Sequence, residues 1–254
     1  MSHVELVGPP GAGKTTVHSR LVEADEYFDG CVEDAVRRRI LRNSRDRYKI
    51  PYRSMPEHVR SFVERKFIEP GFRRTAFDRF VSEQPRFLDI LSLVLRSTEH
   101  ESKWLYSYYK EFAEAYQLGM MTARRDEHLC LDEGFAQCAI AALWRGMSGA
   151  FPLDTYLKAV PMPGLLIHVT APVDVCLDRQ RERNPEDTWA SVEWKRDGQH
   201  DVQREVHGAC RLITDRFSER TNVVTVENTG SIEETLSNVQ SLLSERPDET
   251  REWR

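Results

Sequence analysis

Hydrophobic positions along the chain form two kinds of pattern, short apolar runs and longer stripes with helical spacing. The apolar runs predict five strands, at 4–7, 27–33, 128–131, 165–170 and 222–226. The run at 27–33 has the weakest periodicity of the five. Helical stripes are found at 16–24, 87–95, 104–115, 135–147, 173–184, 201–220 and 232–243. Because strands alternate with helices, the pattern predicts an α/β protein whose mainly parallel sheet is covered on both faces.

The middle third of the chain is expected to be largely helical. The segment 87–95 is apolar nearly all round, which predicts a helix buried in the body of the protein. The stripe of the next helix carries Trp104, Leu105, Tyr108, Phe112 and Ala115. We interpret this stripe as core packing, because helical aromatic stripes usually face the interior, and a base-stacking surface is the alternative.

Length and composition indicate a globular protein. At 254 residues the chain can bury a substantial core, and we expect a single domain over 1–254 with an insertion. No apolar run approaches the roughly 20 residues that cross a bilayer, and the first strand leaves no room for a leader before it. We therefore expect a cytoplasmic protein without a membrane partner. The five cysteines are widely spaced, without C-x-x-C, and indicate small buried residues rather than a disulfide framework or zinc site.

Charge is unevenly distributed along the chain. The segment 35–79 carries 14 Lys and Arg against five acidic residues, a local balance of +9 in a protein of net charge -5. Such a basic segment suggests a surface that meets an anion, here the acceptor, whereas a solvated helix face is the alternative. The net negative charge disfavours non-specific binding of nucleic acid, so no nucleic-acid partner is expected.

The first apolar run leads into a complete phosphate-loop motif, G-x-x-x-x-G-K-[ST]. The expected nucleotide-binding residues are Gly8, Pro9, Pro10, Gly11, Ala12, Gly13, Lys14, Thr15 and Thr16. Glycines let backbone N–H groups turn toward phosphate oxygens, Lys14 adds a positive charge, and the Thr15 hydroxyl suits Mg²⁺. A helix that begins near Gly13 directs the positive end of its dipole at the same anion. The complete motif between a strand and a helix argues against a chance glycine-rich turn.

Asp132 and Glu133 form a second chemical landmark, because they directly follow the apolar run 128–131. An acid at the carboxyl end of a buried strand can hold Mg²⁺ beside Thr15, directly or through water. Asp132 is the better candidate for the metal, and Glu133 for assisting it or acting on the acceptor. Strand-to-helix turns need polar residues in any case, but beside a phosphate loop this pair indicates a metal or catalytic role.

Three arginines alternate at the end of the helix that follows the fourth strand. Arg179 and Arg183 are four residues apart and share a helix face, so they can clamp one polyphosphate, whereas Arg181 points away. A guanidinium suits this role because it stays charged and meets phosphate oxygens with a fork of donors. We expect Arg179 and Arg183 to act in catalysis from a mobile lid over about 179–200. A solvated helix end with neighbouring acids as ion-pair partners is the alternative.

The loop from Gly8 to Thr16, the sequence Asp132-Glu133-Gly134 and the arginine-bearing segment together resemble the P-loop nucleoside and nucleotide kinases, in the broad thymidylate and adenylate kinase-like group. The resemblance covers the sheet scaffold. It implies a three-layer α/β/α P-loop NTPase fold, a five-stranded sheet in the order 2-3-1-4-5, a helical acceptor-binding insertion over about 35–120 and an arginine-rich lid. The sequence departs from thymidylate kinases after Asp132, where that family commonly has an arginine, and from adenylate kinases in its long helical insertion.

These features predict an ATP-dependent kinase that uses Mg²⁺ and moves the γ-phosphoryl group to a nucleoside or nucleoside monophosphate. Phosphoryl transfer needs mainly positioning and charge neutralisation, and Lys14, Asp132 and Glu133 with the two arginines supply both. A kinase of a non-nucleotide alcohol, such as a sugar, an antibiotic or another metabolite, is an alternative. A regulatory P-loop NTPase switch is another. The expected partners are ATP and a small-molecule acceptor, and a homodimer is left open.

Overall fold

The computed structural model describes residues 3–23, 27–28, 32–43, 52, 54–97, 102–124, 127–144, 151–183, 199–229, 234 and 237. Five strands form one sheet: β1 (His3–Val7), β2 (Tyr27–Phe28), β3 (His128–Leu131), β4 (Leu165–Thr170) and β5 (Asn222–Glu227). Their order is β2-β3-β1-β4-β5, which is the order that the family resemblance implies, and every neighbouring pair is parallel. Parallel strands place all their carboxyl ends at one edge of the sheet, so the loops that follow them meet there.

The helices fall into two groups, those that cover the sheet and those inserted between β2 and β3. The first group is α1 (Lys14–Val22), α8 (Phe135–Ala142), α9 (Leu153–Leu157), α10 (Val173–Arg183) and α12 (Gln199–Ser218). The second group is α2 (Val32–Asn43), α4 (Glu57–Val63), the π-helical turn η1 (Glu64–Ile68), α5 (Glu69–Glu83), α6 (Phe87–Ser97) and α7 (Ser102–Thr122).

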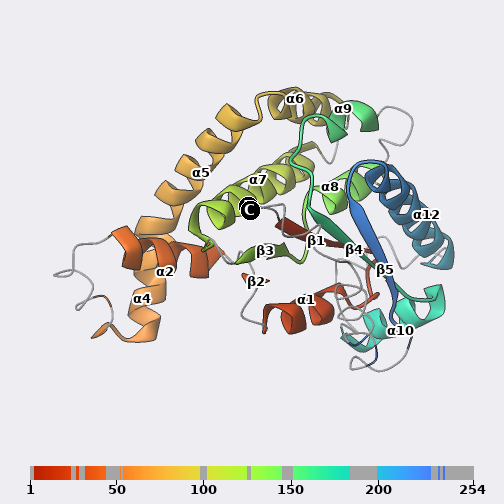
Figure 1. The fold of residues 1–254 in the computed structure, drawn as a ribbon, viewed down its shortest axis with the longest axis horizontal. Coiled ribbons are helices and arrows are strands. Elements are labelled where there is room, and N and C mark those ends of the chain that lie inside the picture. Colours follow the sequence, from red (N-terminus) through yellow and green to blue (C-terminus); the bar gives the residue numbers. More distant parts are fainter. Residues whose placement is uncertain are drawn as a thin grey trace.

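Apolar side chains cover both faces of the sheet. On one face, residues of β1, β4 and β5 pack against α1 and α10. On the other, Val7 and Leu166 join the larger core formed by α6, α7, α8 and α12. Figure 1 shows α1 and α10 below the sheet, α7 and α8 above it, and α2, α4 and α5 extending to one side. A smaller cluster of α2, α5, α7 and β3 residues joins that extension to the body.

Several predicted elements differ from the structure. The strand predicted at 27–33 is short, because β2 ends at Phe28 and α2 begins at Val32. The predicted core stripe of α7 was wrong in part. Leu105 is fully buried, but Trp104 is 39% exposed and Tyr108 is only partly buried, because the helix turns Tyr109 into the core instead. On α6 one side reaches solvent at Leu88, so that helix is not buried all round.

Other predictions fall outside the described residues. They concern the helix at 232–243, most of the lid, at 184–198, and the insertion arginines at 45, 47 and 53. Among the residues that the structure describes, no helix combines the length and apolar character needed to span a membrane.

Candidate active site

The phosphate loop lies between β1 and α1, at the sheet edge where all five strands end. Gly11 and Gly13 have φ angles of +81° and +93°, in the left-handed region that favours glycine. Space is also restricted, because a Cβ on Gly13 would lie 2.3 Å from the side-chain nitrogen of Asn228. These two positions therefore need glycine for both conformation and close approach.

Side chains from other elements hold the carbonyl groups of the loop from outside. The Pro10 carbonyl accepts hydrogen bonds from Gln180 of α10 and Gln203 of α12, each at 3.0 Å. The Ala12 carbonyl accepts a bond of 2.8 Å from Asn228, the residue after β5. Because these side chains engage the carbonyls, other N–H groups of the loop can face an anion, as a phosphate-binding loop requires, although the Ala12 N–H donates to the Pro9 carbonyl at 3.2 Å.

Lys14 lies across the loop at the beginning of α1. Its ammonium donates a 2.9 Å hydrogen bond to the carbonyl of Gly8, and the side chain is buried. The first N–H groups of a helix have no acceptor within the helix, so the start of α1 adds unsatisfied donors beside this charge. The arrangement can bind the phosphate groups of a nucleotide.

Thr15 and Asp132 join the loop to the end of β3. The Thr15 hydroxyl donates a 2.8 Å hydrogen bond to Oδ2 of Asp132. The second oxygen, Oδ1, is buried and has no hydrogen-bond partner among the described residues. A hydroxyl and a carboxylate with an unpartnered oxygen are the hard oxygen ligands that Mg²⁺ prefers, so these two residues fit a magnesium ion.

Glu133 points in another direction from its neighbour. Its Oε2 accepts a 3.0 Å hydrogen bond from the hydroxyl of Tyr108 on α7. Burial, followed by the nearby Glu133 charge, raises the pKa of Tyr108 well above its usual value, so the phenol stays protonated and donates. The turn thus presents one carboxylate toward the loop and one toward the inserted helices.

Glu5, a fully buried acid on β1 that the sequence pattern does not single out, supports this turn. Its carboxylate accepts hydrogen bonds from the N–H groups of Phe135 and Ala136, at 3.1 and 2.9 Å, and lies 2.9 Å from His3. A negative charge at the beginning of α8 is favourable, because the first N–H groups of the helix are otherwise unsatisfied. Glu5 therefore fixes where α8 begins, and with it the preceding Asp132 and Glu133.

Further residues at the loop were also missed. Gln180, Gln203 and Asn228 bind loop carbonyls, and the Gly8 N–H lies 3.5 Å from Oε1 of Gln137. Of these, Asn228 carried a signal, because it directly follows a strand whose carboxyl end lies at the site edge. The glutamines lie within helices and their sequence context gave no comparable indication.

Two of the three alternate arginines, Arg179 and Arg181, lie as their helical spacing predicts, and Arg183 does not. Arg179 reaches the loop and donates a 3.5 Å hydrogen bond to the Ala12 carbonyl. Arg181 points away and forms an exposed ion pair of 3.0 Å with Asp178. Arg183 is exposed at the end of α10, and the structure does not bring it to the loop.

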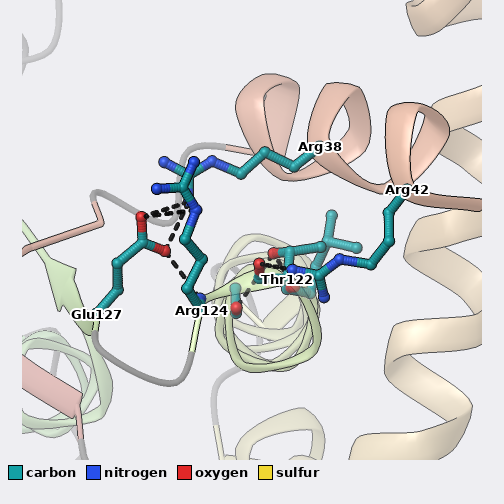
Figure 2. A network of polar contacts seen from close by, with 7 residues as sticks. Arg38, Arg42, Thr122, Arg124 and Glu127 are labelled. Atoms are coloured by element: carbon teal, nitrogen blue, oxygen red, sulfur yellow. Dashed lines mark hydrogen bonds and ion pairs between the residues drawn. The ribbon is translucent and has the colours of Figure 1, made fainter. Parts of the chain in front are cut away.

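Several described arginines of the basic insertion have carboxylate partners. Arg37 pairs with Glu64, Arg73 with Glu69 and Glu114, and Arg79 with Glu83; each pair joins or stabilises helices. Figure 2 shows the same for α2, where Arg38 binds both oxygens of Glu127 and Arg42 reaches the Thr122 carbonyl. For these arginines the structure favours a packing role over a free anion-binding surface.

His168 of β4 is buried, and it lies near His207 of α12, which is only partly buried. Burial lowers the pKa of His168 on β4 to about 4, and the nearby His207 adds to the effect. His207 lies 3.4 Å from Gln203, which in turn binds the loop at Pro10. His168 is thus a buried core histidine, as its position in an apolar strand predicts.

No protein-family model and no curated protein matches the sequence. The fold does resemble that of solved structures. It aligns with deoxyadenosine kinase from M. mycoides with bound dCTP at a TM-score of 0.51 and 9% identity, covering 96% of this chain and 100% of that chain. A second structure of that kinase, with the products dCMP and dCDP, aligns at a TM-score of 0.50 and 11% identity with the same coverage. The chain has the fold of a P-loop kinase.

The P-loop kinase fold explains why these residues converge. Residues after β1, β3, β4 and β5 all lie at the carboxyl edge of the sheet, where such folds bind ligands. At 9% and 11% identity the shared fold does not identify an acceptor, because one fold hosts many substrates.

Proposed function

We propose that this protein is an ATP-dependent kinase that transfers the γ-phosphoryl group to a small acceptor, with nucleosides and nucleoside monophosphates as the leading acceptor class. The observation that carries the proposal is the 2.8 Å bond between Thr15 and Asp132, whose second carboxylate oxygen is buried and unpartnered. It joins a complete phosphate loop to a strand-end acid at the distance that a shared metal ligand set needs.

On the donor side, the backbone of residues 8–16 binds the ATP phosphates. Lys14 exchanges its bond to the Gly8 carbonyl for the β- and γ-phosphates, and Arg179 adds a second positive charge from α10. Arg183 lies four residues further along α10 and is a proposed third positive charge for the bound phosphates, since the two arginines share a helix face. Thr15 and Asp132 would hold Mg²⁺, which when bound would neutralise charge on the transferred group.

On the acceptor side, Glu133 takes the proton of the hydroxyl when the acceptor is a nucleoside. The acceptor oxygen then forms a bond to the γ-phosphorus while the bond between that phosphorus and the β-phosphate oxygen breaks, and ADP leaves. Glu133 suits this role because it faces α7 rather than the phosphate loop. The fold shared with a deoxyadenosine kinase supports nucleosides as the first acceptors to test.

An ADP-release assay over nucleosides, nucleoside monophosphates and small alcohols tests the proposal. We expect little turnover with ATP alone and a strong increase with one acceptor class. Lys14→Ala should abolish that turnover, whereas the exposed control Lys158→Ala should retain it. A switch-type NTPase would instead hydrolyse ATP at the same rate with or without every acceptor. More than about a tenth of the activity in Lys14→Ala would also contradict the assignment, because each tenfold is only about 1.4 kcal/mol.

A further inference from the structure

Two adjacent acids in the turn after β3 are held by different elements. Asp132 accepts its hydrogen bond from Thr15 of the phosphate loop, and Glu133 accepts its bond from Tyr108 of α7. Adjacent side chains ordinarily point apart, and each of these two carboxylates is held in its own direction by one donor.

The ring of Tyr108 is fixed on both sides along α7. Trp104 stacks on it with ring centroids 4.8 Å apart and an interplanar angle of 17°. Phe112 meets it edge to face at 4.6 Å and 71°. Residues four apart lie above one another on a helix, so the three rings form one column. The column determines where the Tyr108 hydroxyl points.

A fixed hydroxyl matters because glutamate has a long, flexible side chain. Proton transfer requires the base to lie within hydrogen-bond reach of the acceptor, and misplacement is costly in rate. Tyr108 binds only Oε2 of Glu133. Among the described residues, Oε1 has no hydrogen-bond partner. One oxygen is therefore anchored and the other remains for an acceptor hydroxyl.

We propose that Tyr108 is a positioning residue, which holds the Glu133 carboxylate toward the acceptor and so separates it from the metal ligand Asp132. This inference rests on the proposed kinase function. Tyr108 acts through Glu133 and does not itself bind the phosphoryl group. The partly exposed aromatic column of α7, which its sequence suggested was core, thus has a role at the reaction site.

The test is a double-mutant cycle of Tyr108→Phe and Glu133→Gln, measured with the acceptor found for the wild type. Tyr108→Phe removes one oxygen and keeps the ring column. We expect kcat to fall about tenfold while KM for ATP stays within about twofold, because positioning of the base acts in the transition state. In a Glu133→Gln background, the same change should alter kcat by less than about twofold, because the two residues act as one unit.

Tyr109→Phe is the matched control on the same helix. Its hydroxyl binds the Cys138 carbonyl in the core, so its loss should lower the thermal midpoint and leave kcat unchanged. A Tyr108→Phe protein with wild-type kcat overturns this inference but leaves the proposed kinase function intact. A further tenfold loss in the Glu133→Gln background also overturns it, since Tyr108 would then act elsewhere. A wild type that phosphorylates no acceptor overturns the proposed function, and the inference with it.

Discussion

The unpartnered carboxylate oxygen of Asp132, at the end of β3, should affect both stability and magnesium-dependent activity. Asp132→Asn tests the two effects separately. The amide keeps one oxygen for the Thr15 hydroxyl and removes the charge. A buried polar atom without a partner costs about 1–3 kcal/mol, and more when it is charged. The ligand-free variant should therefore keep its free energy of unfolding or gain about 1 kcal/mol. For a chain of this size, that gain corresponds to a rise in Tm of about 2–4 °C.

Activity should change in the opposite direction. Loss of one group that stabilises charge in the transition state typically lowers kcat by about 10²–10³-fold. We expect a fall of that size at moderate Mg²⁺, with partial recovery at high Mg²⁺, because a neutral amide binds the ion more weakly than a carboxylate. If Asp132 is a metal ligand, loss of its charge should therefore keep or raise stability and lower activity.

Thermal unfolding with and without Mg-ATP, together with rates over a series of Mg²⁺ concentrations, measures both effects. Asp78→Asn, an exposed acid on α5, is the control and should change neither. Near-normal activity with unchanged magnesium dependence would show that Asp132 is only a turn residue. A loss of more than about 1 kcal/mol in stability would show that its charge stabilises the fold, contrary to the reasoning from its unpartnered oxygen.

Four further predictions use residues whose surroundings differ sharply. Gly13→Ala should weaken ATP binding and lower stability by more than about 1 kcal/mol, because φ is +93°. Gly71→Ala, in open space on α5, should instead raise thermal stability by about 0.5–1 kcal/mol. Arg179→Ala should lower kcat at least about tenfold and Arg181→Ala should change it little, and equal effects would contradict this. The pKa of His168, about 4, lies below its unfolded value, so stability should fall as pH drops from about 6.5 to 4, with a smaller slope in His168→Gln.

The sheet could be predicted from the sequence because its strands are buried on both faces. Such strands appear as continuous apolar runs, and parallel pairing then places the phosphate loop and Asp132 at one edge. The 27–33 run misled because an apolar patch does not reveal where a strand gives way to a helix. In the described part of the chain, β2 ends at Phe28 and α2 begins at Val32.

Much of the site could not be predicted, because it depends on contacts between distant segments. Glu5 looks like a polar interruption in a strand, and only the start of α8 shows why a buried acid is tolerated there. Tyr108 carries the same helical pattern as a core residue, since a stripe of aromatics does not tell which neighbour turns inward. The positive charge of the insertion likewise suggests an anion site, and the sequence does not reveal that Arg38 and Arg73 pair with the distant acids Glu127 and Glu114.

The most direct test of the kinase assignment is to follow the γ-phosphate itself. ATP labelled at that position is incubated with the protein, Mg²⁺ and a panel of nucleosides, nucleoside monophosphates and small alcohols, and the products are separated. The account predicts that the label moves to the oxygen of one acceptor class, and that Lys14→Ala abolishes this transfer. Label that appears only as inorganic phosphate, at the same rate with or without every acceptor, would contradict it.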